Sequence, residues 1–474
     1  MRASTRDASL VLGGKLLVSC LVLASGFRAL SDDDYARIVI AQRFAESPSL
    51  DPSGTSWLPF PFWLNGTAML LVGSSVTVAR GVALLLGLAS VLAIWLALRW
   101  LGARPLGAVL GALAAGMFPY SAWLGVAAVP ELPSAALCLL GLASLAHDGT
   151  PRIIGGVALT AACLSRYEAW PVAAVFAVYC AKDARRARVH AGAALAALAG
   201  PLLWLLNGQL HHGSALFFVK RVSDYRRAVG AGNQATWDAL LGFPSMLLRA
   251  EPELLAAALV VVVLALALGA GSVFRRHARV LAALAAALAF LIAGDLRDGA
   301  PTHHGERALL PIWVGLAALG GDAFSEAWQR ARGSAKVLLL AMPGLAMAPM
   351  AGIARPWYSR RDAFIDRSSE VAIGQAARAL DAASGRLAID SRDFGFYAVM
   401  AGFGAPSRAE PLDEHDPREP RAPDPFAAPG GLRARLAAAR ADWLVVEVEH
   451  LGAARELGRV VRQEGKYALI ALAR

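Results

Sequence analysis

The chain has 474 residues, of which 57% are hydrophobic and 17% charged, and its mean hydropathy is +0.49. This balance excludes an ordinary soluble domain, because apolar runs long enough to cross a bilayer recur along most of the sequence. The net charge of +10 does not indicate nucleic-acid binding, since much of it lies in short loops between apolar runs, where Lys and Arg orient a membrane protein. The sequence therefore predicts an α-helical polytopic membrane protein.

The first apolar run covers about residues 9–30 and follows two arginines, so the N-terminus is predicted to be cytoplasmic. Three consecutive acids, Asp32, Asp33 and Asp34, come directly after it on the outer side. Neighbouring carboxylates beside a membrane are costly to desolvate and repel one another. They are therefore expected either to take part in the function or simply to lie in water.

Residues 32–46 carry apolar side chains at helical spacing with charges between them, which predicts a helix on the outer membrane surface. The acids at its start also suit a helix N-cap and first turn, where the helix dipole favours negative charge. Capping and catalysis are compatible roles. The aromatic, Pro-interrupted segment 57–63 predicts an interfacial loop.

Two apolar pieces, residues 153–165 and 169–181, are each only about 20 Å long as helices, too short to cross a bilayer alone. They predict a short hairpin whose turn, Ser165-Arg166-Tyr167-Glu168, lies at membrane depth and faces a cavity. One long kinked helix is the alternative. About eleven spans are predicted, with the N-terminus inside and the C-terminus outside. Apart from the hairpin, they cover about 9–30, 76–98, 105–122, 132–146, 189–206, 253–272, 280–294, 308–324 and 337–353.

From about residue 355 the sequence becomes polar and rich in Pro and Gly. It predicts a small extracytoplasmic α/β domain over 355–474, after a transmembrane domain over 1–354. Segment 405–430 reads as a loop. The predicted strands are Leu387–Asp390, Trp443–Val448 and Tyr467–Ala473.

Polar groups that can carry chemistry gather on the outer side of this topology. Carboxylates can accept a proton from a hydroxyl, and Arg or His can hold a phosphate. Several of these residues could instead have structural roles. Arg166 and Glu168 could form an ion pair, Lys220 and Arg221 could contact lipid headgroups, and the His pairs could bind zinc or have no function. Beyond the three acids, the candidates are Glu131, Arg166, Tyr167, Glu168, His211, His212, Lys220, Arg221, His303, His304, Glu306 and Arg307.

Five short motifs follow one another in a recognisable order along the chain: the acidic run of the first loop, Trp57-Leu58-Pro59, Glu131, Ser165–Glu168, and Glu306-Arg307 with Pro311. In order and sidedness they resemble the integral-membrane GT-C glycosyltransferases, in particular bacterial, mannosyltransferase-like branches that use polyprenyl-phosphate sugars. The resemblance covers about residues 10–320. It implies a membrane hexosyltransferase that moves a sugar from a polyprenyl-phosphate donor to an extracytoplasmic glycan, lipid or protein acceptor.

The resemblance also implies roles for residues. A first-loop acid would be the base. This chain has three acids in a row instead of the usual two, so more than one can match the catalytic position; Asp33 is favoured, followed by Asp34 and Asp32. Arg307 and Arg166 are the first candidates for the donor phosphate. Mg²⁺ or Mn²⁺ is a possible cofactor, since some members of the superfamily need a metal and others do not. Further substrate-binding candidates are Glu131, Tyr167, Glu168, Lys220, Arg221 and His304.

Other classes stay open at this point. A glycan ligase or polymerase of the same architecture would use a diphosphate-linked donor, and a transporter or lipid flippase would also have broken helices. A noncatalytic assembly factor would leave the acidic loop unexplained. Arg-over-Lys bias and abundant Ala are typical of GC-rich bacteria, so the expected location is the bacterial inner membrane, with the active site at its periplasmic face.

Overall fold

The computed structural model describes residues 2–184, 187–232, 235–301, 304–352, 364–380, 384–390, 393–412, 416, 418, 424–426 and 430–473, without the side chains of 2–3 and 349–352. The chain forms two compact units. The helical unit comprises Met1–Gly26, Thr55–Phe60 and Ala83–Arg361. The α/β unit comprises Phe27–Gly54, Pro61–Val82 and Asp362–Arg474, so the acidic first loop belongs with the C-terminal residues. The domain boundary predicted at 354/355 lies outside the described residues.

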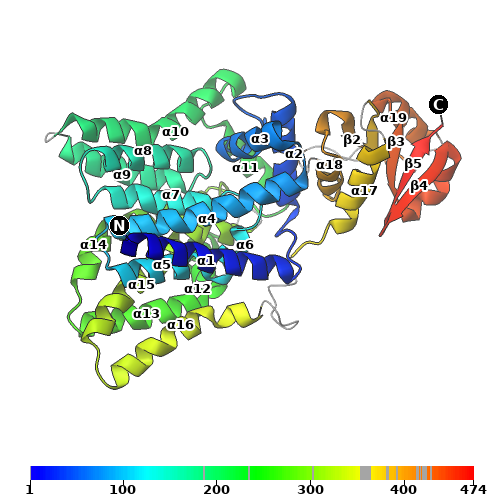
Figure 1. Cartoon of the computed structure of the whole chain (residues 1–474). Helices are drawn as coiled ribbons and strands as arrows, with labels where there is room; N and C mark the ends of the chain where they lie inside the picture. Colours follow the sequence, from blue (N-terminus) through cyan, green and yellow to red (C-terminus); the bar gives the residue numbers. More distant parts are fainter. Residues whose placement is uncertain are drawn as a thin grey trace. The chain divides into compact units, whose positions relative to one another are not determined.

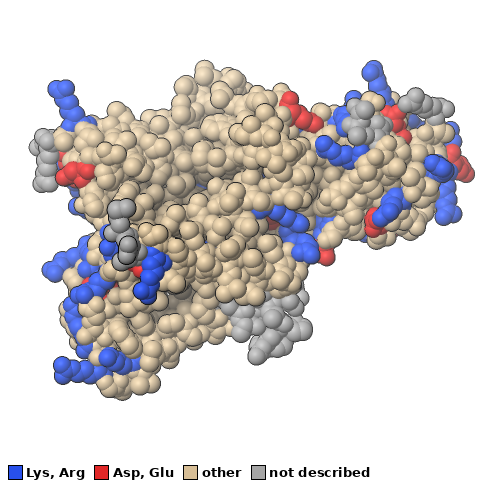
Figure 2. Space-filling view, viewed as in Figure 1, with Lys and Arg blue, Asp and Glu red and all other residues tan. Residues whose placement is uncertain are grey.

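Helices make up most of the helical unit (Figure 1). Figure 2 shows that most of the visible surface over these helices carries no Lys, Arg, Asp or Glu. In chain order the helices are α1 (Arg2–Ala24), the larger part of α4 (Val76–Trp100), α5 (Pro105–Met117), α6 (Pro119–Leu124), α7 (Glu131–Ser144), α8 (Thr150–Cys163), α9 (Ala169–Asp183), α10 (Arg188–His212), α11 (Phe217–Ala228), α12 (Thr236–Ala250), α13 (Pro252–Ala267), α14 (Ser272–Asp295), η1 (Gly305–Leu309), α15 (Leu310–Arg330) and α16 (Ser334–Gly352).

Five helices of the described chain are long and apolar enough to cross a membrane. The count becomes six if α12 and α13, which meet at 84°, form one broken span. Four shorter apolar helices accompany them, including α5 and α7. The polytopic helical class is thus confirmed, while the number of about eleven spans stays a prediction.

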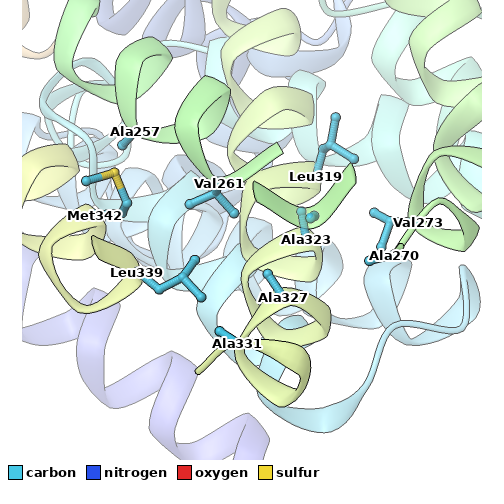
Figure 3. Packing of buried hydrophobic residues seen from close by; sticks show 11 residues of the cluster. Ala257, Val261, Ala270, Val273, Leu319, Ala323, Ala327, Ala331, Leu339 and Met342 are labelled. Carbon is cyan, nitrogen blue, oxygen red and sulfur yellow. The ribbon is translucent and has the colours of Figure 1, made fainter. Parts of the chain in front are cut away.

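Small residues let these helices pack closely. Ala257 and Val261 of α13, Ala323 and Ala327 of α15, and Leu339 of α16 belong to one buried cluster (Figure 3). A second close approach joins α5 to α15, because a Cβ atom on Gly321 would lie 2.2 Å from the backbone nitrogen of Gly111. Small side chains at such crossings are the usual means of tight helix packing in membranes.

The predicted break between 153–165 and 169–181 is confirmed, since α8 ends at Cys163 and α9 begins at Ala169. The predicted span 105–122 is instead divided into α5 and α6. Phe118 adopts an extended backbone conformation before Pro119, the first residue of α6. Proline disfavours helical geometry in the residue before it, which explains the division. Segment 57–63, predicted as a loop, becomes helical from Phe60, where α3 (Phe60–Val72) begins.

The α/β unit contains α2 (Asp32–Glu46), whose bounds match the predicted helix 32–46. Gln42 Nε2 of α2 donates to the carbonyl of Ala401 at 2.9 Å, so α2 packs on α18 (Phe396–Phe403). The remaining helices are most of α3, the first residues of α4, α17 (Ser368–Leu380), η3 (Pro406–Arg408), α19 (Gly431–Ala439), η4 (Val448–His450), α20 (Leu451–Ala454) and η5 (Arg455–Leu457).

A five-stranded sheet with the order β2-β1-β3-β5-β4 completes this unit. β1 (Leu387–Ile389) pairs in parallel with β2 (Ala409–Pro411) and β3 (Trp443–Glu447), whereas β5 (Tyr467–Leu472) is antiparallel to β3 and β4 (Gly458–Glu464). The three predicted strands correspond to β1, β3 and β5. The two edge strands, β2 and β4, were not predicted, and β2 lies inside the segment 405–430 that was predicted as a loop.

Candidate active site

Arg166 lies in the turn between α8 and α9, where two carboxylates surround its guanidinium. Its Nη1 atom is 3.1 Å from Glu131 Oε1, and its Nη2 atom is 2.7 Å from Glu168 Oε1. Glu131 is the first residue of α7, and both glutamates are buried. The two buried carboxylates thus outweigh the single positive charge of Arg166 before any ligand arrives. The structure thus brings three predicted site residues together, in the ion-paired arrangement that the sequence left open.

Tyr167 fixes the same turn to other elements of the helical unit. Its hydroxyl donates to the carbonyl of Ser56 at 2.8 Å and accepts from Trp204 Nε1 at 3.0 Å. Its ring stacks on Phe218 with 4.6 Å between centroids. Phe60 N–H donates to the carbonyl of Leu164 at 3.0 Å. The segment that contains Trp57-Leu58-Pro59 and the Ser165–Glu168 turn, two of the motifs that carry the resemblance, are therefore neighbours.

A second polar cluster forms around Glu306, at the start of η1. The hydroxyl of Tyr120 in α6 donates to Glu306 Oε1, and His304 Nδ1 lies 3.5 Å from the same oxygen. The backbone N–H of Tyr120 donates to Glu251 Oε1 at 3.0 Å. Arg307, the next residue in η1, is buried. A buried guanidinium can hold an anion in a low-dielectric setting.

Lys220 and Arg221 lie on α11. The Lys220 side chain is 83% exposed, and its ammonium is 3.0 Å from Asp224, one turn further along the same helix. Arg221 is half-buried. This position of Lys220 suits contact with lipid headgroups or a solvated surface better than a desolvated phosphate.

In the α/β unit, the structure gives different contacts to the acids of the first loop. Asp34 Oδ2 accepts from the backbone N–H groups of Leu30 at 2.6 Å and Ser31 at 3.0 Å, and it forms a capping box with Ser31. Asp32 is held by Arg367, with Oδ1 2.9 Å from Nε and Oδ2 3.1 Å from Nη2. Asp33 lies between them and is half-buried. The helix-cap reading therefore holds for Asp34, while Asp32 is part of an ion pair.

Sequence reasoning missed Tyr120, Glu251 and Arg367. Tyr120 lies near the end of the predicted span 105–122, and Glu251 lies at the end of the long predicted loop between the spans 189–206 and 253–272. Neither residue is part of a recognisable motif. Arg367 lies 335 residues from Asp32, in a polar stretch that contains many arginines. No local signal marks any of the three.

The described side chains that could act as metal ligands are not arranged to bind a metal ion. Among the described residues, no three His, Cys, Asp or Glu side chains lie close enough together to hold one. Both oxygens of Asp32 bind Arg367, and His211 and His212 are exposed at the end of α10. His303 lies outside the described residues. Within the described part of the chain there is thus no ligand set for Mg²⁺, Mn²⁺ or Zn²⁺.

The structure of this chain is similar to solved structures of known proteins. No family model matches the sequence. No curated protein matches it either. ArnT from Cupriavidus metallidurans in the apo state has 15% identity and a TM-score of 0.57 over 99% of this chain and 98% of that chain. ArnT bound to undecaprenyl phosphate has 15% identity and a TM-score of 0.55, covering 98% of this chain and 97% of that chain.

An archaeal protein shares the fold as well. The oligosaccharyltransferase of Archaeoglobus fulgidus in the apo form is 12% identical, with a TM-score of 0.53 over 94% of this chain and 70% of that chain. The chain therefore shares its fold with these proteins, and the expected architecture of a polytopic helical protein with a small C-terminal sheet is confirmed.

Proposed function

We propose that the chain transfers a sugar from a polyprenyl-phosphate donor to an extracytoplasmic acceptor hydroxyl. The observation that carries this proposal is the match to ArnT over nearly the whole of both chains, one structure of which holds undecaprenyl phosphate. Fold alone does not determine function, so the argument also rests on the acids and the buried arginine described above. The proposed setting is a bacterial inner membrane, with the N-terminus cytoplasmic and the sheet domain outside.

The reaction is a single displacement. Asp33 accepts the proton of the acceptor hydroxyl, the acceptor oxygen attacks the anomeric carbon, and polyprenyl phosphate leaves with the bonding electrons. Asp33 is proposed on the resemblance to GT-C enzymes, which implies a first-loop acid as the base; in the structure Asp32 binds Arg367 through both oxygens and Asp34 caps α2. A positioned base typically contributes about 10²–10⁴-fold to the rate.

Arg307 is the proposed partner of the leaving phosphate. It is buried, and a positive charge placed where negative charge develops is worth most in a desolvated setting. Arg166 is proposed to order the hairpin turn, because Glu131 and Glu168 already pair with its guanidinium. Tyr167 supports that turn, and His304 lies beside Glu306. Lys220 and Arg221 are proposed to contact lipid headgroups at the membrane surface.

The test uses the full chain in lipid nanodiscs with a panel of polyprenyl-phosphate sugars that differ in the sugar. Release of polyprenyl phosphate and transfer of labelled sugar are followed for the wild type, Asp33→Asn and Asp34→Asn. Transfer that is lost in Asp33→Asn, with unchanged thermal unfolding, supports the proposal. Transfer that survives both substitutions refutes Asp33 and Asp34 as the base. Turnover only with diphosphate-linked donors would make the chain a glycan ligase or polymerase instead.

A further inference from the structure

Within the α/β unit, the first loop is attached to the chain that leads into α17. Ile365 N–H donates to the carbonyl of Ala29 at 3.0 Å and forms an isolated antiparallel bridge. Phe27 and Phe364 meet edge to face, with 5.0 Å between ring centroids. These contacts bring the residue before α17, Arg367, to the start of α2.

Arg367 holds carboxylates from three places in this unit. It forms a bidentate pair with Asp32 of α2, at 2.9 and 3.1 Å. Its Nη1 atom lies 3.0 Å from Glu370 Oε1 in α17 and 2.9 Å from Asp393 Oδ2 in the turn before α18. Bidentate Arg–carboxylate pairs fix direction as well as distance. Glu370 and Asp393, which both follow Arg367 in the sequence, hold its guanidinium in place. The Arg367 side chain that binds Asp32 is therefore itself fixed.

The neighbouring acids make this contact important. Three consecutive carboxylates repel one another, and Glu370 and Asp393 would add to that repulsion without a cation among them. Asp34 is fixed at the other end of the acidic run by the N–H groups of Leu30 and Ser31. Asp33 thus lies between two anchored neighbours in the first turn of α2.

We propose that Arg367 is a positioning residue that, by clamping Asp32, orients the first turn of α2 and presents Asp33 to the acceptor. This inference rests on the proposed function for the role of Asp33. Asp32 then serves as the anchor of the acidic loop. The C-terminal domain contributes through Arg367 to transfer, although Arg367 touches neither donor nor acceptor.

The experiment compares Asp32→Asn, Arg367→Gln and the double variant in nanodiscs. Each single variant should lower kcat by about 10- to 100-fold, the range expected for a slightly misplaced catalytic group, with little change in donor KM. Because both substitutions break one contact, the double variant should be no worse than the poorer single variant. Arg367→Lys should recover part of the rate. Arg378→Gln is the matched control, since Arg378 lies in α17 and donates to the carbonyl of Phe403.

Hydrogen exchange gives a readout that does not need activity. The amides of Leu30 and Ser31 should exchange faster in Asp32→Asn and in Arg367→Gln to the same extent, and remain at the wild-type rate in Arg378→Gln. Losses of kcat that simply multiply in the double variant would overturn the clamp, as would unchanged exchange in Arg367→Gln. If Arg367→Gln does not fold, Asp32→Asn and Arg367→Lys test the same contact. A wild type without transfer but with this exchange pattern refutes the proposed function while supporting the clamp.

Discussion

Arg166 Nη1 and Glu131 Oε1 are 3.1 Å apart, although 35 residues separate them in the sequence. This contact joins the turn between α8 and α9 to the first residue of α7. Since Glu168 binds the other side of the guanidinium, the turn is closed by a group of three charges whose side chains are 18% exposed or less. The turn keeps its geometry because these ion pairs and the hydrogen bonds of Tyr167 satisfy its polar groups within the protein.

Arg166→Met should therefore destabilise the protein strongly. Removing the cation leaves two buried carboxylates without their balancing charge, and breaking a buried ion pair from one side costs about 3–5 kcal/mol. The thermal unfolding temperature in detergent should fall well below that of Glu131→Gln, which leaves Arg166 paired with Glu168. Unchanged stability together with loss of polyprenyl-phosphate binding would make Arg166 a phosphate ligand instead.

Apolar length and charge bias predicted most of this fold because both are local signals. The helix 32–46, the break at Ser165–Glu168 and the strands β1, β3 and β5 were all visible in short windows of sequence. α11 and α12 were missed because charged residues interrupt their apolar runs, and β2 because three residues at a sheet edge show no period. The site was harder, since Arg367 and Tyr120 acquire their roles only through partners 335 and 186 residues away.

Acid should weaken the α/β unit through Asp393. Burial raises the pKa of Asp393, but the backbone N–H of Gly395 and the charge of Arg367 outweigh it and hold the pKa below the usual 3.8. A carboxyl group whose pKa is lower in the folded state stabilises the fold above pH 3.8, and this contribution is lost as the pH falls through the folded-state pKa. The unfolding temperature of the full chain should therefore drop more between pH 5 and pH 3 in the wild type than in Asp393→Asn. Equal falls in the unfolding temperature of the two proteins would show that Asp393 does not contribute to the loss of stability in acid.

Gly321→Ala should disrupt the crossing of α5 and α15. The new Cβ atom would lie 2.2 Å from the nitrogen of Gly111, where backbone on both sides prevents relaxation. Overpacking of this kind costs about 1–3 kcal/mol or more. Gly344→Ala in α16 is the matched control, because no atom lies within 4 Å of its Cβ position. A helix gains up to about 1 kcal/mol from Ala over Gly, so the control should unfold at the wild-type temperature or slightly above it. Equal unfolding temperatures for the two variants would contradict the close crossing.

Arg307→Ala tests the electrostatic part of the proposed reaction. If Arg307 stabilises charge that develops on the leaving phosphate, its loss should lower kcat by about 10²–10³-fold and change donor binding much less. Single-turnover transfer and equilibrium binding of polyprenyl phosphate, measured in the same nanodiscs, separate the two effects. Lys220→Ala is the control, since its exposed ammonium pairs with Asp224 on the same helix and should affect neither quantity by more than a few-fold. An effect of Arg307→Ala on binding alone would show that Arg307 holds the donor equally in the ground and transition states. The stabilising charge would then have to come from another residue.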